Sequence, residues 1–293
     1  MGILTNLING IRLGSIYAII ALGYTMVYGI AKMLNFAHGD VIMIGAYVAF
    51  FALYRYGMSL FVSVLLAVLL CTVLGIIIER LAYKPLRSAT SLAVLITAIG
   101  VSYFLQNAAL LMWGSTSKMF PSVLNYGFLE LFDGQLKISY QVLISIAVCL
   151  VIMVALTLFV KYTNLGKAMR ACSEDKDAAR LMGINVDNVI SITFAIGSGL
   201  AAIASVLLCA TYPTITPTMG SMPGIKAFTA AVLGGIGSIP GAFLGGLILG
   251  VIETITKVYI SSELTDAIVF GVLIVVLLLK PTGLLGKAMN EKV

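Results

Sequence analysis

The charged residues of this sequence are concentrated in one segment, where they could form a docking element for another protein. Nine charged residues fall within residues 161–187, and they include the run EDKDAARLMG. The dipole of a helix favours acidic residues in its first turn, and glycine often ends a helix. We therefore predict two short helices within residues 162–187, the second with Ser173 as its N-cap and Gly183 as its stop.

The composition of the second predicted helix suits docking better than insertion into lipid. The helix is too polar to enter a membrane, yet it presents Ala178, Ala179, Leu181 and Met182. Such a helix can lay its apolar residues into a groove of a partner protein. The alternative is a solvated loop, because mixed charges also mark segments that only meet water.

A second polar group interrupts the apolar sequence at MLNFAHGD, residues 33–40. Asn35, His38 and Asp40 could line or gate a path for a polar solute. Alternatively, Asp40 caps the helix that follows, Asn35 ends the helix that precedes, and His38 is a satisfied loop residue. A single histidine without a cluster of Cys or Glu predicts no metal site.

Other polar residues recur within apolar segments. Thr97, Ser102, Gln106 and Asn107 follow roughly helical spacing. Such residues form hydrogen bonds between membrane helices, worth about 1 kcal/mol each, or they line a pore. The candidates for a substrate path are Asn35, His38, Asp40, Thr97, Gln106, Asn107, Thr229 and Ser238.

The elements that must position these residues are membrane-spanning helices. Of the 293 residues 60% are hydrophobic and 10% charged, whereas a soluble domain carries about 25% charged residues. Many apolar runs are long enough to cross a hydrocarbon core about 30 Å thick. We predict an all-α, polytopic transmembrane bundle that forms a single domain over residues 1–293, with about eight hydrophobic segments. The predicted segments are residues 7–31, 40–54, 60–82, 91–112, 140–161, 188–211, 225–258 and 265–280.

The segment at residues 225–258 is too long for one simple crossing, since a helix rises about 1.5 Å per residue. Glycines and a proline interrupt it at GGIGSIPGA, residues 234–242. We expect two pieces, either two short spans or a re-entrant half-helix followed by a span. Transporters often place substrate where discontinuous helices meet, and residues 33–40 and 234–242 are the predicted pair of interruptions.

The distribution of basic residues predicts the orientation in the membrane. Twelve of the 18 lysines and arginines can lie on one side, which the positive-inside rule makes the cytoplasm. The C-terminus and residues 162–187 then face the cytoplasm, whereas the N-terminus and residues 113–139 and 212–224 face out. The twelve residues are Lys32, Arg80, Lys84, Arg87, Lys161, Lys167, Arg170, Lys176, Arg180, Lys280, Lys287 and Lys292. The aromatic residues predicted at the outer interface are Trp113, Tyr126 and Phe128.

Several other classes of protein fit the sequence poorly. The four cysteines lack the spacing of a disulfide framework or a zinc site, and no clustered histidines, paired carboxylates or nucleophile triad suggest an enzyme. No basic stripe predicts nucleic-acid binding. The predicted spans carry almost no ionisable residues, which argues against a proton-coupled carrier or a stand-alone channel. A phosphate loop of the form GxxxxGK[ST] is also missing, so any ATP would be bound and hydrolysed by a partner.

Several long motifs resemble one family of permeases. DAARLMG has the acid-Ala-Ala-x-x-x-Gly form of the cytoplasmic coupling motif of ABC importer permeases, although the Ile-x-Leu-Pro ending is absent. Together the motifs resemble the H-type permease of high-affinity branched-chain amino-acid importers, from about residue 7 to residue 287. The other motifs are GYTMVYGIAKMLNFAHGDVIMIGAYV, IERLAYKPLR, LITAIGVSYFLQN, RACSEDKDAARLMGINVD, KAFTAAVLGGIGSIPGAFLGGLILG and PTGLLGK.

The resemblance implies a location and partners. It places the chain in the bacterial cytoplasmic membrane, paired with a second related permease subunit. Two ABC ATPase subunits would dock on the cytoplasmic face, and an extracytoplasmic solute-binding protein would deliver Leu, Ile or Val. The chain would need no cofactor of its own. The residues implied in ATPase coupling are Asp177, Ala178, Ala179 and Gly183, with Arg170, Glu174 and Arg180 flanking them.

The motifs do not specify the solute. The same permease class serves urea, short amides and other amino acids, and a stand-alone secondary carrier or channel is the rival from another class. Whether the paired permease is a second copy or a relative also stays open.

Overall fold

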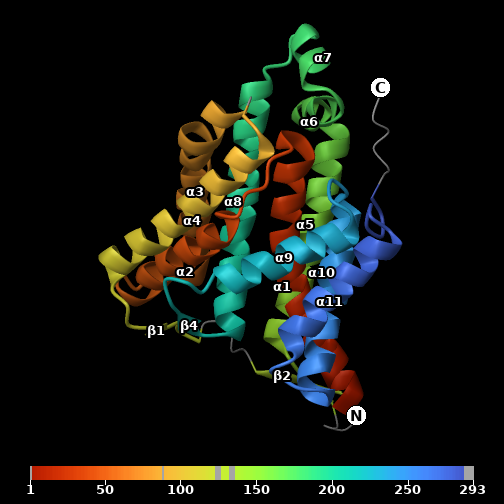
Figure 1. The fold of residues 1–293 in the computed structure, drawn as a ribbon. Helices are drawn as coiled ribbons and strands as arrows, with labels where there is room; N and C mark the ends of the chain where they lie inside the picture. Colours follow the sequence, from red (N-terminus) through yellow and green to blue (C-terminus); the bar gives the residue numbers. More distant parts are fainter. Residues whose placement is uncertain (1, 88, 123–126, 132–135, 287–293) are drawn as a thin grey trace. The chain divides into compact units, whose positions relative to one another are not determined.

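The computed structural model describes residues 2–87, 89–122, 127–131 and 136–286 (Figure 1). Its helices are α1 (Gly2–Ala31), α2 (His38–Tyr54), α3 (Leu60–Ile78), α4 (Ser91–Trp113), α5 (Tyr140–Tyr162), α6 (Asn164–Glu174), α7 (Lys176–Leu181), α8 (Val186–Thr211), α9 (Ser221–Gly234), α10 (Ile239–Tyr259) and α11 (Thr265–Leu279). A π-helical turn η1 (Glu79–Tyr83) and a 3-10 turn η2 (Lys84–Leu86) extend α3. The short strands are β1 (Lys118–Met119), β2 (Phe128–Leu131), β3 (Leu136–Ser139) and β4 (Thr214–Ile215).

The predicted all-α, polytopic membrane fold is confirmed. Within the described part of the chain, six helices are long and apolar enough to cross a membrane, and α2 and α11 are shorter apolar helices. The expected break in residues 225–258 is also present, because α9 ends at Gly234 and α10 begins at Ile239. Gly235 and Gly237 have φ of 106° and 93°, values that favour glycine, so the glycines at these positions permit the turn.

The chain divides into two compact units. Unit 1 comprises Met1–Thr25, Tyr126–Thr157 and Lys226–Val293, and unit 2 comprises Met26–Asn125 and Leu158–Ile225. The division falls within three helices, so α1, α5 and α9 each contribute residues to both units.

Small residues allow close helix packing in each unit. In unit 1 the beginning of α1 lies against α10, where a Cβ on Gly250 would be 2.1 Å from the backbone nitrogen of Gly14. In unit 2 α8 packs against α2 and α3, and a Cβ on Gly75 would be 2.1 Å from Oγ of Ser198 (Figure 1). Close backbone approach of this kind is typical of helices that associate in lipid.

Unit 2 places the predicted cytoplasmic and outer segments at opposite ends of α4 and α8. β1, which follows α4, pairs antiparallel with β4, which follows α8. At the other ends, Arg87 precedes α4 and forms an ion pair with Asp187 at the start of α8. The segments predicted to face out thus lie together within this unit, as do the basic residues near α3 and α8. The absolute orientation stays a prediction, and Tyr126 lies outside the described residues.

Candidate functional site

The charged segment forms two short helices, as predicted, but a different residue caps the second. The hydroxyl of Thr163 caps α6 by accepting from Gly166 N at 2.9 Å. Asp175 caps α7, and its carboxylate accepts from Asp177 N at 2.9 Å and from Ala178 N at 3.0 Å. The prediction that Ser173 is the N-cap is wrong, because Ser173 still belongs to α6 and donates to Arg170 O at 2.7 Å.

The end of α7 exposes two apolar side chains. Leu181 is 89% exposed and Met182 is 82% exposed. Gly183 follows them with φ of 81°, so the predicted helix stop is confirmed. The backbone N–H of Ile184 then returns to Ala179 O at 3.0 Å, which satisfies a carbonyl of the last turn.

Ala179 faces inward, whereas the sequence suggested that it is presented to a partner. It is buried, while Ala178 is exposed. The difference arises because α7 packs one side against α6 and α8. Met169 and Cys172 of α6 are buried as well. Asp177, Arg180, Arg170 and Glu174 lie on the exposed side, with Arg180 and Asp177 3.4 Å apart.

One lysine ties this segment to the end of α1. Lys176 Nζ donates to Ala31 O at 2.6 Å. Burial lowers the pKa of Lys176, and the positive charges of Arg87, Lys32 and Arg180 lower it further, although Cys172 opposes them. Burial also raises the pKa of the Cys172 thiol, against the effect of Lys176 and Arg180. The half-buried ammonium of Lys176 thus links the beginning of α7 to the end of α1.

An ionic cluster that is buried at Glu79 and more exposed at Lys84 and Asp187 connects the beginning of α8 with the end of α3. Arg87 is paired with both Glu79 and Asp187, and Lys84 Nζ lies 3.1 Å from Asp187. Glu79 is fully buried in η1, and Ser191 Oγ donates to it at 2.5 Å. Sequence reasoning missed this cluster, although the charged pair in IIIERLAY was a visible signal. π-helical turns occur frequently at functional sites.

The interruption at residues 33–40 leads to a buried polar cluster. Gln106 Nε2 of α4 donates to Asp40 Oδ1 at 2.9 Å. The same Nε2 atom lies 3.2 Å from Oγ of Ser102 and 3.2 Å from Oγ of Ser221. Asp40 is buried in the first turn of α2. The interpretation of Asp40 as a helix cap is wrong, because Ala37 occupies the N-cap and no side chain caps α2. Buried amide and carboxylate groups of this kind can meet a polar solute.

Asn35 and His38 do not have the structural roles suggested as alternatives. Helix α1 ends at Ala31, and Lys32 adopts the left-handed backbone with φ of 57°. Asn35 instead accepts a hydrogen bond from Tyr83 Oη at 2.9 Å. His38 is the first residue of α2 and is buried, so it is not a loop residue.

The remaining substrate-path candidates are dispersed. Asn107 is exposed and donates to Tyr103 O at 2.8 Å in its own helix, while Thr97 is only partly exposed. Thr229 is buried in α9. Ser238 caps α10 by accepting from Gly241 N at 3.2 Å. Of the predicted residues, Asp40 and Gln106 are joined by a side-chain hydrogen bond, and His38 N donates to Asn35 O at 3.2 Å.

Comparison with known proteins assigns the chain to a family. A family profile described as the permease component of the branched-chain amino acid transport system matches residues 6–277. The chain belongs to this permease family. The high-affinity branched-chain amino acid transport system permease protein BraD of Pseudomonas aeruginosa is 49% identical, with 99% of this chain and 98% of BraD covered.

Two further relatives with similar coverage and one solved structure are similar to this chain. LivH of Escherichia coli K12 is 49% identical over 99% of this chain and 97% of its own length. A probable LivH of Methanocaldococcus jannaschii is 28% identical over 93% of this chain and 89% of its own length. A solved structure, PsaBC from Streptococcus pneumoniae in complex with Fab, aligns over 90% of this chain and 89% of its own with a TM-score of 0.46 and 15% identity.

Unit 1 of the permease contains a buried ionic network that the sequence analysis did not predict. Lys226 Nζ of α9 lies 3.0 Å from Glu253 Oε1 of α10 and 2.7 Å from Asp266 Oδ1 of α11. Lys257 Nζ lies 2.6 Å from the same Glu253 oxygen, and Tyr17 donates to Oε2 at 2.8 Å. The expectation that the spans carry almost no buried ionisable groups is therefore wrong. Hydropathy averages over a window and so conceals single charges that are paired inside the fold.

Metal chemistry receives no support from the described residues. Among them, no group of three or more His, Cys, Asp or Glu side chains could hold a metal ion. The described part of this permease thus has an exposed pair of apolar side chains at the end of α7 and polar clusters inside each unit.

Proposed function

We propose that this permease is the membrane subunit of an ATP-driven ABC importer that moves branched-chain amino acids into the cytoplasm. The observation that supports it most is the near end-to-end identity of 49% with BraD, whose name gives this transport system. In this proposal the partners are a second related permease subunit, two ABC ATPases that bind the ATP, and an extracytoplasmic solute-binding protein.

The proposed coupling element is the pair α6 and α7. The exposed Leu181 and Met182 would enter a groove of the ATPase. The short helix α7, capped by Asp175, would then transmit movement of the ATPase. Ile184 connects the end of α7 to α8 through its hydrogen bond with Ala179. The salt bridges of Arg87 then connect α8 to α3. A displacement of α7 would therefore move the helices of unit 2 together.

Docking is tested by replacing Leu181 with aspartate. Leu181→Asp places a charge where we propose an apolar contact, so the ATPase should no longer co-purify and uptake of labelled leucine should fall at least tenfold. Met119→Asp is the matched control, because Met119 is also an exposed apolar residue, at the other end of unit 2 in β1. Equal ATPase binding by both variants would contradict the proposed docking.

The energy source and the cargo need separate measurements. The chain reconstituted alone in vesicles should not concentrate leucine, whereas the assembled system with ATP should. Competition of labelled leucine uptake by isoleucine and valine, but not by urea or short amides, is the expected specificity. Accumulation by the chain alone would contradict ATP-driven import.

A further inference from the structure

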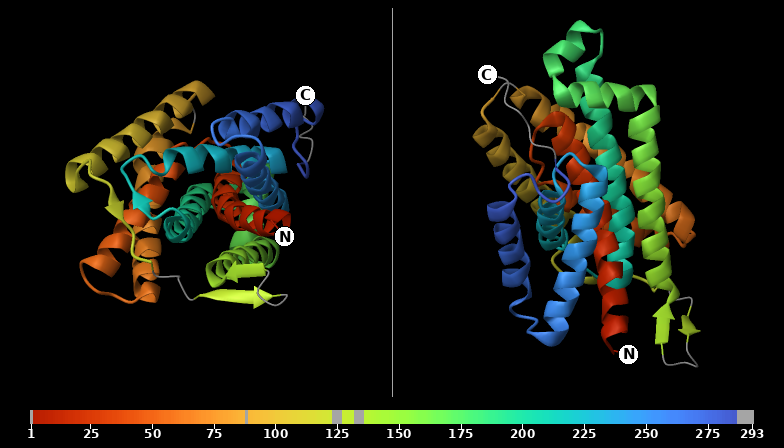
Figure 2. Two further views of the ribbon diagram at one scale, coloured as in Figure 1. Left: turned by 90° about the horizontal axis from the view of Figure 1, so that it is seen from below. Right: turned by 90° about the vertical axis from the view of Figure 1, so that its right-hand side faces the viewer.

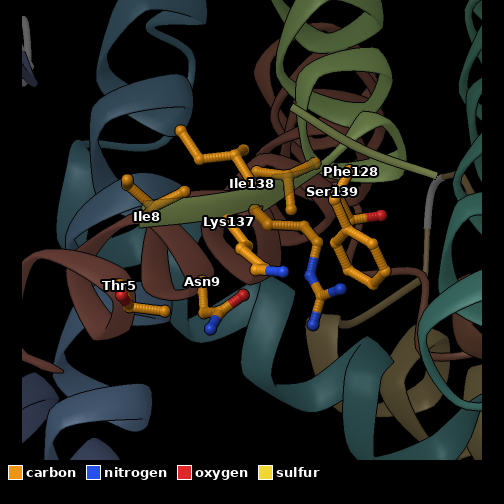
Figure 3. A pocket seen from close by; sticks show the side chains of 9 residues that line it. Thr5, Ile8, Asn9, Phe128, Lys137, Ile138 and Ser139 are labelled. Carbon is orange, nitrogen blue, oxygen red and sulfur yellow. The ribbon is translucent and has the colours of Figure 1, made fainter. Parts of the chain in front are cut away.

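A pocket lies in unit 1 between the beginning of α1 and the β2–β3 hairpin. Its volume is about 210 Å³, and all of its lining residues belong to this unit. Figure 3 shows Thr5, Ile8 and Asn9 on the α1 side and Phe128, Lys137 and Ser139 on the hairpin side. Arg12, Ile138 and Val142 complete the lining.

The pocket is suited to an anion. Arg12 and Lys137 both line it, and no acidic residue is among the lining residues that the structure describes. Lys137 Nζ is 2.7 Å from Glu130 Oε1, but both side chains are more than half exposed, so solvent weakens this pair. The guanidinium of arginine matches the geometry of phosphate and carboxylate oxygens. Thr5, Asn9 and Ser139 add hydroxyl and amide donors.

The length of α1 allows this pocket to lie at the level of lipid headgroups. The 30 residues of α1 span about 45 Å, whereas the hydrocarbon core is about 30 Å thick. An upright α1 would therefore extend beyond the core, and its pocket residues lie near its beginning. The hairpin directly precedes α5, so it too lies where a span begins (Figure 2).

Exposed apolar side chains occur on the same elements as the pocket residues. Ile3 and Leu4 are exposed on α1, Phe128 is exposed on β2, and Tyr140 and Leu143 are exposed at the beginning of α5. Aromatic residues are common at the membrane interface, and apolar surface next to a cationic pocket fits acyl chains below a headgroup.

We propose that this pocket binds the phosphate of an anionic phospholipid, with Arg12 and Lys137 as its cationic ligands. An amino acid is a poorer occupant, because its ammonium group would meet two cations and no acidic partner among the described lining residues. Free phosphate shares the anionic chemistry but has no acyl chains for the exposed apolar side chains. The site is independent of the transport activity proposed above.

Native mass spectrometry of the purified full chain in detergent tests the proposal. Phosphatidylglycerol should bind more tightly than phosphatidylcholine. Arg12→Gln and Lys137→Gln should each weaken phosphatidylglycerol binding about fivefold, since a basic residue near an anionic lipid contributes about 1 kcal/mol. Glu130→Gln should strengthen binding, because it releases Lys137 from its partner. If Glu130 only stabilised the hairpin, Glu130→Gln would not strengthen phosphatidylglycerol binding.

Lys118→Gln is the control, because Lys118 is a basic residue of β1 in unit 2. The Lys118→Gln variant should bind phosphatidylglycerol as tightly as the wild type does. Equal binding of the two lipids, or unchanged binding by both Arg12→Gln and Lys137→Gln, would overturn the proposal. Displacement of phosphatidylglycerol by millimolar inorganic phosphate would overturn the lipid assignment, because the pocket would then recognise the free ion.

Discussion

Gly183 is a single residue on which the conformation at the end of α7 depends. Its φ is 81°, and a Cβ at this position would meet nothing within 4 Å. A larger residue would therefore suffer backbone strain alone, which costs about 1 to 2 kcal/mol in the left-handed region.

We predict that Gly183→Leu lowers leucine uptake about tenfold while the protein still reaches the membrane, because strain of this size shifts the end of α7. Uptake and membrane content measured on the same cells provide the test. Gly271→Leu is the matched control, since Gly271 also has open space around it but lies within α11 without a positive φ. Normal uptake by Gly183→Leu would show that the left-handed turn is dispensable.

Glu253 shows how strongly one buried charge can matter. It is 1% exposed and lies between Lys226 and Lys257, while Tyr17 donates to its second oxygen. Removing one charge of a buried ionic group leaves its partners uncompensated.

We predict that Glu253→Gln lowers the free energy of unfolding in mild detergent by about 3 kcal/mol, because Lys257 would lose this carboxylate partner and Lys226 would keep only Asp266 of its two carboxylate partners. Glu130→Gln is the matched control and should cost no more than about 1 kcal/mol, since Glu130 also pairs with one lysine but is exposed. Denaturant titrations of the two purified variants and the wild type would measure both changes in the free energy of unfolding. Equal costs would indicate that the Glu253 network contributes no more than a surface pair.

The contact between α7 and α1 depends on one titratable group. Lys176 Nζ donates to Ala31 O, and its pKa lies below the ordinary value of 10.5 because of burial and the nearby charges of Arg87 and Lys32. Between the lowered pKa and 10.5, the folded state holds fewer protons than the unfolded state. The free energy of unfolding therefore rises with pH in that window.

We predict that Lys176→Met flattens this pH dependence. Thermal unfolding in detergent is measured from neutral pH to pH 10.5. The free energy of unfolding should increase less with pH in the variant than in the wild type. Lys167→Met is the control, because Lys167 is an exposed lysine of the neighbouring helix α6 and its loss should leave the slope unchanged. A slope that persists in Lys176→Met would assign the pH dependence to another group.

The orientation of the whole molecule is still a prediction, and unit 2 offers positions for testing it. Thr116 lies in the segment predicted to face out, and Ala178 lies in the segment predicted to face the cytoplasm; both are exposed. The four native cysteines, Cys71, Cys149, Cys172 and Cys209, are all buried. A thiol reagent should therefore react mainly with an introduced cysteine.

We predict that a membrane-impermeant maleimide labels Thr116→Cys in intact cells and labels Ala178→Cys only after the cells are permeabilised. The unmodified protein serves as the background control. The reverse pattern would invert the topology and would remove α7 from the reach of a cytoplasmic ATPase.

Several features could be predicted from the sequence because they depend on neighbouring residues. The span from Ser91 to Trp113 begins and ends within one residue of its predicted limits, since its apolar length decides it. The break before Ile239 follows from glycines that permit unusual backbone angles. Short helices around residue 175 follow from nearby polar groups and a glycine stop, although the capping residue was mistaken.

Only the tertiary structure decided which polar groups meet. Asp40 and Gln106 are 66 residues apart in the chain, and Arg87 and Asp187 are 100 residues apart. No local pattern specifies such pairs, because hydrogen bonds and ion pairs depend on how helices pack. The sequence therefore determined the membrane helices and the charged segment, whereas packing decided that Asp40, Glu79 and Glu253 are buried with partners.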